Sequence, residues 1–454
     1  MTERGQRLPE APPPADGASP LPGAGGDRGQ GPSHAGGAPD RAQHARTDVL
    51  AVLPERARDL ARLRVLAADG LPVVTVMGKY NHGKSRLLNE LLGHDAFAVA
   101  DRRQTVALAD CERDGVRWLD APGIDADVAT ADDRHAMQAA WLESDIRLFV
   151  HAAKEGELDA RELAMLEALL ADGERTSRQM LFVLSQVDQL AGDDQLAAVL
   201  EAIRRQLPQV EPYQTSSARH RRGLEGGKRL LLENSGIPHL REALAQARAR
   251  VPQARQHETA LLFLEIRTEL QALRERCLQE RDALRRRQRE QRQRFVHGLE
   301  AVFAKVGADL REVIDAPGPD HAQTVDSAAD HYRQTAAKLE RARIQVAYSR
   351  ACIQIDGFLV GHGVVGLPSA QRTGVRAMDS VMVAVMGVSV KRRADLRRLF
   401  CEPAGARQLQ QEFLRYFELS DDRVALAASL AATSTKLDAV DKALSSLRWL
   451  EGGA

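Results

Sequence analysis

A short apolar run at residues 73–77, Val-Val-Thr-Val-Met, leads directly into Gly78–Ser85, which matches the pattern GxxxxGK[ST] in full. A helical pattern rich in leucine opens straight afterwards, at residues 87–92. β-branched apolar residues favour a buried strand, and glycine permits a tight turn. The sequence therefore predicts a strand, a glycine-bearing loop and a helix in direct succession.

The segment Gly78–Ser85 has the chemistry of a phosphate-binding loop. Backbone N–H groups of the loop and of the following helix N-terminus would cradle the α- and β-phosphates of a nucleotide. Gly78 and Gly83 would allow the turn and the close backbone approach. Lys84 would reach the β- and γ-phosphates, and the Ser85 hydroxyl would bind Mg2+. The alternative is a glycine-rich turn that binds no ligand.

Two elements that respond to the γ-phosphate are expected further along the chain. An apolar strand ends at the run Asp120-Ala121-Pro122-Gly123. Asp120 would supply a carboxylate to the Mg2+ shell, and the Gly123 N–H would contact the γ-phosphate. Thr105, just before another strand, would close on Mg2+ when the γ-phosphate is present. The alternatives are a plain Asp-Pro-Gly turn and a threonine that begins a strand.

Two more elements are expected to contact the base. The strand expected at residues 180–185 leads into Ser185-Gln186-Val187-Asp188. Asp188 would accept both hydrogens of the guanine N1 and N2 groups, a pair that adenine lacks, so it would select GTP over ATP. Ser216-Ser217-Ala218 follows the last strand, and its backbone would contact the guanine O6.

Three parts of the chain are expected. Residues 1–46, rich in Pro, Gly and Ala, are predicted to be a disordered tail. Residues 47–252, with a leading helix, are predicted to form an α/β domain with a mostly parallel sheet and helices on both faces. Residues 253–454 lack strand patterns and are predicted to form an all-α bundle or stalk. The strands are expected at 73–77, 106–110, 116–120, 146–152, 180–185 and 210–216, and the long C-terminal helices around 255–315, 320–362, 375–400 and 405–450.

The charge balance and the cysteine content of the chain indicate which partners it could bind and in which cellular compartment it would reside. The 63 basic and 63 acidic residues balance, so the whole chain has no field that demands nucleic acid or a membrane. The four cysteines are far apart and form no CxxC pair. They are typical of reduced residues in a cytoplasmic protein rather than of a disulfide framework or a zinc site.

Two stretches of the C-terminal half are candidates for contact with a partner. Residues 274–294 carry an excess of arginine, which forms either a solvated helix face or a face for lipid headgroups or RNA. Apolar runs at residues 353–368 and 381–390 precede the basic Lys391-Arg392-Arg393. Both runs are shorter than a membrane-spanning helix needs. Residues 353–393 are therefore either buried in the helical core or dock reversibly on a membrane or a partner.

The five elements, in this order, resemble those of the translation-factor class of P-loop GTPases. The stretches GKYNHGKSRLLNELLG and DAPGI are similar to Era-type and bacterial dynamin-like proteins, and so is HAAKEGELDARELAMLEAL. The stretch SSARHRRGLEGGKRLLLENSGIPHLREAL and the helical C-terminal half favour the dynamin-like proteins. The resemblance covers about residues 71–250. It implies a GTPase with Mg2+, in which Lys84, Thr105 and Gly123 act in catalysis.

The resemblance also implies the residues that contact the ligands. Mg2+ would be held by Ser85, Thr105 and Asp120. The nucleotide would be contacted by Gly78, Asn81, His82, Gly83, Lys84, Ser85, Arg86, Asp120, Gln186, Asp188, Ser217 and Ala218.

Three positions depart from or extend the family pattern. Ser185 and Gln186 stand where the family usually has Asn or Thr and then Lys, so affinity for guanine is expected to be modest. Ile124 follows DAPG where Ras-like enzymes place a glutamine that orients water, so slow intrinsic turnover is expected. Asn81 occupies the position where many Era-type relatives help to hold K+, which makes K+ stimulation a hypothesis.

Three functions remain open at this point. The first is a dynamin-like enzyme that self-associates through its GTP-binding domain or its stalk and acts at an anionic membrane surface, as a cytoplasmic protein in peripheral membrane contact. The second is an Era-type switch that binds RNA or a ribosomal particle, and the third is a switch for a protein partner. No Gly-x-x-Gly loop within a βα pattern, the mark of a KH module, is recognisable after the α/β module, and neither strand patterns nor interleaved aromatics appear there. The first function is therefore favoured over RNA binding.

Overall fold

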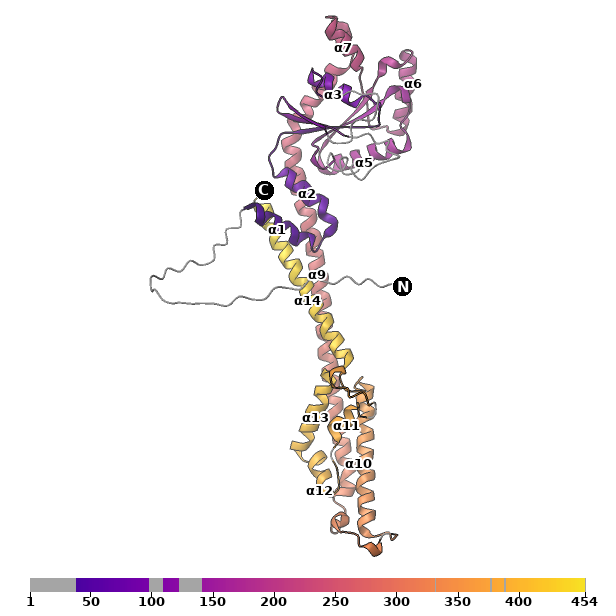
Figure 1. Cartoon of the computed structure of the whole chain (residues 1–454), viewed down its shortest axis with the longest axis vertical. Coiled ribbons are helices and arrows are strands. Elements are labelled where there is room, and N and C mark those ends of the chain that lie inside the picture. The colour runs from indigo at the N-terminus through magenta and orange to yellow at the C-terminus, as the bar shows by residue number, and fades with distance from the viewer. Residues whose placement is uncertain are drawn as a thin grey trace, which may run out of the picture. The chain divides into compact units, whose positions relative to one another are not determined.

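The computed structural model describes residues 38–97, 109–121, 141–330, 332–375, 378–387 and 389–453. The chain divides into two units, residues 1–43 and residues 44–454. The second unit contains the sheet and the long helices (Figure 1). Thr105 and Gly123, expected to act in catalysis, lie outside the described residues.

A six-stranded sheet forms the α/β part, in the order β2-β3-β1-β4-β5-β6. Every neighbouring pair is parallel except β2 and β3, so the expected mostly parallel sheet is confirmed. The bounds of the strands are β1 Val73–Met77, β2 Ala109–Arg113, β3 Val116–Asp120, β4 Ile146–Ala152, β5 Gln179–Ser185 and β6 Tyr213–Gln214.

Strand β2 differs from its expected position at residues 106–110, of which 106–108 lie outside the described residues. It pairs with β3 through a tight hairpin, in which Arg113 faces Val116. The two linking residues, Asp114 and Gly115, have φ values of 52° and 68°. Positive φ at both central residues is the geometry that closes a two-residue hairpin, so this turn sets the register of β2.

Helices cover both faces of the sheet. On one face, α3 (Lys84–Leu92) and the first turns of α9 (Ile237–Ile314) bury apolar side chains against β1, β4 and β5. On the other, α5 (Ala160–Thr176) and α6 (Asp193–Gln206) pack on Phe149 and Phe182. All seven residues of β4 are buried, because helices cover this central strand on both faces.

Helix α9 is the element that joins the sheet to the C-terminal half. It runs for 78 residues without interruption, so the expected domain boundary at residue 252 falls inside one helix. Proline normally breaks a helix interior because it lacks an N–H donor. Here Val251 and Ala254 are buried on either side of Pro252, and their packing holds the helix together through the proline.

The C-terminal half is helical, as expected, and its helices after α9 are shorter than the sequence pattern predicts. Its apolar core gathers around Phe295, Phe303, Phe413 and Phe417, and Phe295 stacks on Phe417 with ring centroids 4.1 Å apart. The helices are α10 Ala336–Gly361, α11 Val381–Met386, α12 Arg393–Leu396 with a π-turn at Arg397–Cys401, α13 Pro403–Glu418 and α14 Asp421–Gly452.

Part of the predicted disordered tail is ordered. Helix α1 spans Ala38–Leu50, so it begins inside residues 1–46. Val49 is fully buried in a cluster that also contains residues of α2 (Ala57–Leu66), α9 and α14. Burial of apolar residues at the end of α1 thus stabilises a helix whose first residues belong to the Pro/Gly-rich segment.

The two apolar runs at residues 353–368 and 381–390 are divided between core and surface. Ile355, Leu359 and Met386 are among the side chains buried in the helical core, whereas Ile353 and Val365 are exposed. No helix in the described part of the chain is both long and apolar enough to span a bilayer.

Candidate nucleotide-binding site

The loop between β1 and α3 is shaped by two glycines with left-handed or extended backbone. A Cβ atom on Gly78 would lie 2.2 Å from the Val150 carbonyl oxygen, so only glycine fits against β4. Gly83 caps α3 with a φ of 78°. Buried Lys84 then turns back over the loop, and its Nζ donates to the carbonyls of Gly78 and Lys79 at 3.0 and 2.8 Å. These contacts hold the ammonium group within the curve of the loop.

Ser85 and Asp120 meet beyond the carboxyl ends of the neighbouring strands β1 and β3. The Ser85 hydroxyl donates to Asp120 Oδ2 at 2.5 Å, although the two residues are 35 positions apart. The other oxygen, Oδ1, is buried and accepts no hydrogen bond from the described residues. Burial raises the pKa of the Asp120 carboxyl, and the Ser85 hydrogen bond and the charge of Lys84 act against this rise. A hydroxyl beside a carboxylate with an unused oxygen fits the hard oxygen ligands that Mg2+ prefers.

Ser185 and Gln186 connect the end of β5 to the phosphate-binding loop. The Ser185 hydroxyl donates to the His82 carbonyl at 2.6 Å. Gln186 has a φ of 60°, and its side-chain amide donates to the Asn81 carbonyl at 2.7 Å. The two residues that depart from the family pattern therefore both bind the backbone of Gly78–Ser85.

Asp188 lies in the turn after β5, partly exposed. Its Oδ1 accepts a 2.6 Å hydrogen bond from Ser216, and Ser216 also caps α7 (Ser217–Glu225) by accepting from the Arg219 N–H. The carboxylate is thus fixed beside the start of α7, where Ser217 and Ala218 are the first two residues. The two segments expected to contact the base are neighbours.

A buried cluster beneath the loop was not predicted from the sequence. The Nδ1 of His82 lies 3.4 Å from Glu162, and the Nδ1 of His151 lies 2.9 Å from the same carboxylate. Lys79 of the loop also reaches Glu162, at 3.2 Å, and Asp159, at 2.5 Å. Asp159 and Glu162 form a capping box at the start of α5, a pattern that can be recognised in a sequence.

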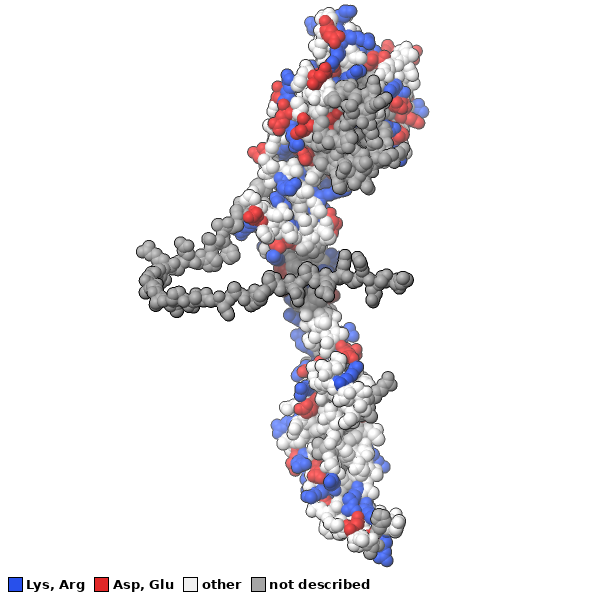
Figure 2. All heavy atoms as spheres, in the orientation of Figure 1, with Lys and Arg blue, Asp and Glu red and all other residues white. Residues whose placement is uncertain are grey.

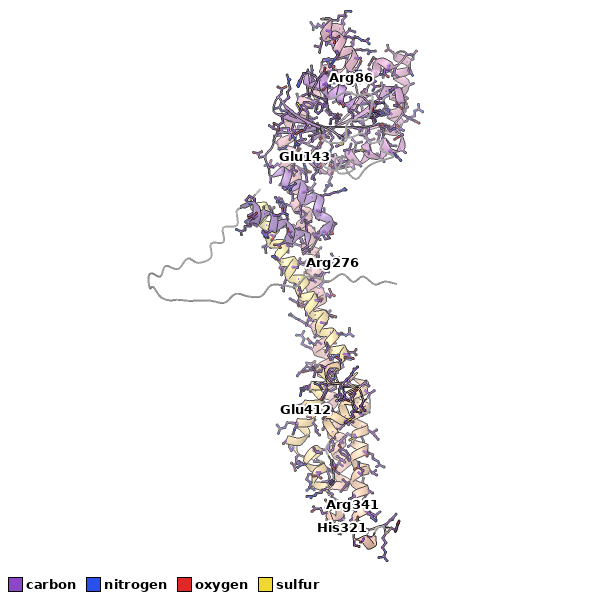
Figure 3. All side chains as sticks on the ribbon, in the orientation of Figure 1. Arg86, Glu143, Arg276, His321, Arg341 and Glu412 are labelled. Atoms are coloured by element: carbon purple, nitrogen blue, oxygen red, sulfur yellow. The ribbon has the colours of Figure 1, made fainter. Side chains whose placement is uncertain are left out.

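Several expected site residues make few contacts or lie beyond the described residues. Asn81 and Arg86 are exposed, and Arg86 lies on α3, on the surface of the α/β domain (Figure 3). Asn89 fixes the chain after α3, since its Oδ1 accepts from the N–H groups of Ala96 and Phe97. Thr105, Gly123 and Ile124 fall in the segments 98–108 and 122–140, which are not described.

Comparison with known proteins identifies the class of the α/β part. Residues 73–186 match the family described as 50S ribosome-binding GTPase. The tRNA modification GTPase MnmE of Verminephrobacter eiseniae is 31% identical over 224 residues, 44% of this chain and 45% of that protein. This chain therefore spans less than half of that relative.

A second relative matches almost from end to end. The uncharacterized protein ACIAD1443 of Acinetobacter baylyi is 46% identical over 410 residues, 89% of this chain and 97% of that protein. The chain belongs to the family of this protein. Because residues 73–186 match a GTPase family, it is a P-loop GTPase with a long helical C-terminal region, and residues 47–252 are called the G domain below.

Two solved structures resemble the GTPase at low similarity. Era of Aquifex aeolicus bound to GDP and AlF4− is 22% identical, with a TM-score of 0.28 over 35% of this chain and 55% of that chain. An oligomerised bacterial dynamin pair is 12% identical, with a TM-score of 0.34 over 89% of this chain and 76% of that chain. Because both TM-scores are low, the family assignment rests on the sequence relatives.

The buried His82 makes the stability of the GTPase sensitive to acid. Burial lowers the pKa of His82 to about 4, and the neighbouring Glu162 only partly offsets this. The unfolded state therefore binds more protons than the folded state between pH 6.5 and 4, and stability falls as the pH falls. For this residue we expect a loss of about 2 kcal/mol between pH 7 and pH 5.

The measurement is chemical unfolding of the wild type and of His82→Gln at both pH values. The wild type should lose about 2 kcal/mol more than the variant on acidification. A variant with the same pH dependence as the wild type would show that His82 does not titrate in this way.

Proposed function

We propose that the loop Gly78–Ser85 binds the phosphates of GTP and that Asp188 selects guanine. Lys84 is held inside the loop by two carbonyls, and a γ-phosphate oxygen offers it a stronger, charge-assisted partner. Asp188, fixed by Ser216, would accept the two guanine hydrogens, while the start of α7 would contact O6. Water attack on the γ-phosphate then proceeds with the loop amides and Lys84 stabilising the developing charge.

The proposed metal ligands are Ser85 and Asp120, with Thr105 expected to join them in the GTP state. Bound Mg2+ would neutralise charge on the β- and γ-phosphates. For Gly123 a contact with the γ-phosphate stays a prediction, as does a role of Asn81 toward K+. The Asn81 backbone is held by Gln186, which would stabilise the loop in the conformation that presents this residue.

Replacement of Asp188 should change the base that the GTPase prefers. Asp188→Asn loses the acceptor pair for guanine, and affinity for GDP should fall by at least about 100-fold. Xanthine carries a carbonyl in place of the 2-amino group, so the asparagine amide can donate to it, and xanthosine diphosphate should bind better than GDP. Fluorescent nucleotide titration measures both affinities.

Lys84→Ala is the control for this experiment, because it removes a phosphate contact that both nucleotides share. It should weaken both of them alike and abolish turnover. If Asp188→Asn kept its affinity for GDP, the base would have to be recognised by other residues.

We propose further that the nucleotide state is transmitted to the helical region through Glu258 of α9, and this contact carries the proposal. Glu258 is fully buried and pairs with two buried guanidinium groups, those of Arg62 and Arg178. Arg62 also donates to the carbonyls of residues 142 and 143, and Arg178 to the carbonyl of Trp141. These carbonyls directly follow the segment 122–140 that contains Gly123.

A second buried carboxylate, that of Asp145, adds to the contacts between α9 and the G domain. Asp145 accepts from the Val73 N–H at the start of β1 and pairs with Arg255 of α9 at 2.6 Å. Although burial opposes ionisation, the hydrogen bond from Arg255 and the charges of Arg62 and Arg255 hold the pKa of this carboxyl below its ordinary value. Movement after the DxxG segment would thus displace groups bonded to α9.

Neutralising Glu258 should uncouple the two parts of the GTPase. Glu258→Gln removes the salt-bridge partner of Arg178 and leaves Arg62 paired with Asp145 alone, so we expect a loss of about 3 kcal/mol in stability. Nucleotide affinity should stay within about twofold, because Glu258 makes none of the contacts of the phosphate loop. Hydrogen exchange of α10–α14, compared between GDP and a non-hydrolysable GTP analogue, should differ in the wild type and not in the variant.

Glu300→Gln is the matched control, since it makes the same change at an exposed position of the same helix. It should keep the nucleotide-dependent difference. If the Glu258→Gln protein kept it as well, transmission through this carboxylate would be wrong.

We propose that the helical region acts at an anionic membrane surface as part of a self-associating assembly, with the protein cytoplasmic and peripheral. Support comes from the connection between α9 and α10, where Val325 is 89% exposed and Tyr332 is 96% exposed. Exposed Arg333 lies beside Tyr332, and the labelled His321 and Arg341 belong to the same end of the helical region (Figure 3). Exposed apolar tips beside cationic groups favour shallow insertion among acidic headgroups.

RNA binding is the second candidate, favoured by one observation. In the Arg-rich stretch 274–294, Arg285, Arg286, Arg287 and Arg289 are exposed, and the described residues give them no ion pair. The face of the G domain in Figure 2 instead intersperses basic and acidic side chains. An exposed run of arginines could contact phosphates of RNA, as the description of the matched GTPase family would suggest.

GTP turnover in the presence of each surface separates these candidates. Without lipid, specific activity should rise with protein concentration, and adding anionic liposomes should raise it further. Tyr332→Asp should remove the response to liposomes. Arg286→Glu with Arg287→Glu should leave that response within about twofold of the wild type. The opposite result, stimulation by structured RNA that the arginine variant loses, would favour the Era-type function.

A further inference from the structure

Helix α3 carries a buried glutamate, a residue that is rarely buried unless it is paired. Glu90 is 2% exposed, and both oxygens of its carboxylate are bonded to α7. Its Oε2 lies 2.6 Å from Nδ1 of His220, which is also 2% exposed, and its Oε1 accepts from Nε of Arg221 at 2.8 Å. One carboxylate therefore connects the helix that follows the phosphate-binding loop to the helix that begins beside Asp188, and both helices belong to the G domain (Figure 1).

Helix α7 is held in the G domain mainly by polar contacts. Of its nine residues, His220 and Gly223 are buried, and its one large apolar side chain, Leu224, is 55% exposed. The apolar clusters formed by the described residues contain no side chain of α7. Gly223 lies against Leu232 of α8 (Arg229–Glu233), a short helix with no buried residue. Because hydrogen bonds are directional, the groups to which α7 is bonded set its direction.

Two attachments fix α7 beside the expected position of the base. At the start of the helix, Ser216 acts as the cap and donates to Asp188 at 2.6 Å. About one turn later, roughly 6 Å along the axis, His220 and Arg221 bond to Glu90. A helix attached only at its cap could pivot about that point. The second attachment therefore determines where the first residues of α7 lie.

The two helices begin at opposite ends of the proposed nucleotide. Helix α3 starts at the phosphate-binding loop, and α7 starts with Ser217 and Ala218, whose backbone is expected to contact the guanine O6. A backbone N–H donates well only over a narrow range of distance, near 2.9 Å. A shift of about 1 Å at the start of α7 would therefore lose the contact with O6. The distance between α3 and α7 thus bears directly on recognition of the base.

Further contacts keep Glu90 itself in place. Arg221 also pairs with Asp95, which follows α3, at 2.6 Å. The backbone carbonyl of Glu90 accepts from Arg241 of α9 at 2.6 Å. The end of α3 is thereby bonded to α9 as well as to α7. Loss of the carboxylate would consequently release α7 rather than move α3.

We propose that Glu90 is a positioning residue for guanine recognition, which acts through His220 and Arg221 on the start of α7. The carboxylate does not touch the nucleotide. It holds Ser217 and Ala218 at the distance from the phosphate-binding loop that a guanine nucleotide spans. This inference rests on the proposed function, since it assumes the contact between α7 and O6, and it names the group that aligns the base site with the phosphate site.

Nucleotide affinity of the full-length chain tests the proposal, with isothermal titration calorimetry as the measurement. The two ligands are GDP and 2-aminopurine riboside diphosphate, which carries a hydrogen in place of O6. Glu90→Gln keeps the size of the side chain, but its single oxygen replaces two acceptors that face different groups. Affinity for GDP should fall about tenfold, and affinity for the 2-aminopurine nucleotide should stay within about twofold of the wild type.

Glu225→Gln is the matched control for this variant. It makes the same change at an exposed position, the last residue of α7. Both affinities of the control should stay within about twofold of the wild type. Circular dichroism of every variant checks that the fold is kept.

Two substitutions of His220 test whether its hydrogen bond carries the effect. A carboxylate oxygen only accepts, so Nδ1 of His220 is the donor to Glu90. The amide nitrogen of asparagine takes nearly the place of Nδ1, whereas that of glutamine takes the place of Nε2. His220→Asn should therefore keep the affinity for GDP within about threefold, and His220→Gln should lower it about tenfold. Neither should change the affinity for the 2-aminopurine nucleotide by more than about twofold.

The possible failures separate this inference from the proposed function. An equal loss of both nucleotides in Glu90→Gln would mean that the carboxylate supports the fold and does not align the base site. Unchanged affinity for GDP in that variant, or equal behaviour of His220→Asn and His220→Gln, would also overturn the inference. A wild type that binds both nucleotides equally well would contradict the contact with O6, and the proposed function would then fail together with the inference.

Discussion

A charge buried in a protein must be paired, and the pairing of Glu258 governs how the two halves of this GTPase are joined. An unpaired carboxylate in this position would be strongly destabilising. Arg62 of α2 and Arg178, directly before β5, satisfy it, and both arginines also donate to carbonyls of residues 141–144. One carboxylate of α9 is thereby linked, through Arg62 and Arg178, to α2, to the residue before β5 and to the backbone of residues 141–144.

The phosphate loop depends on a similar set of contacts that hold its backbone from outside. Ser185 and Gln186 bind its carbonyls, Lys79 binds α5, and Gly78 leaves room for the backbone of β4. Where the family pattern has a lysine after the first position, Gln186 supplies a neutral amide to the loop. The loop is therefore fixed mainly by neutral hydrogen bonds on this side, and the modest affinity for guanine stays a prediction.

Elements defined by local pattern could be predicted from the sequence. The strands at 73–77, 116–120 and 146–152 have the expected bounds, because runs of buried apolar residues mark them directly. The joint at Glu258 could not be predicted, because its partners are 80 and 196 residues away and no spacing relates them. The sequence pattern predicts a domain end at Pro252, because the pattern alone does not reveal the packing that carries α9 through the proline.

The unbroken course of α9 has a mechanical consequence. Glu258 and Leu310 belong to one helix and are separated by about 50 residues, or roughly 75 Å at 1.5 Å per residue. A tilt of about 5° at the carboxylate would displace the far end by roughly 6 to 7 Å, if the helix stays rigid over that length. With its pivot at Glu258, α9 would act as a lever arm, in which a small tilt at the amino ends of β1 and β5 becomes a larger displacement at the far end of the helix.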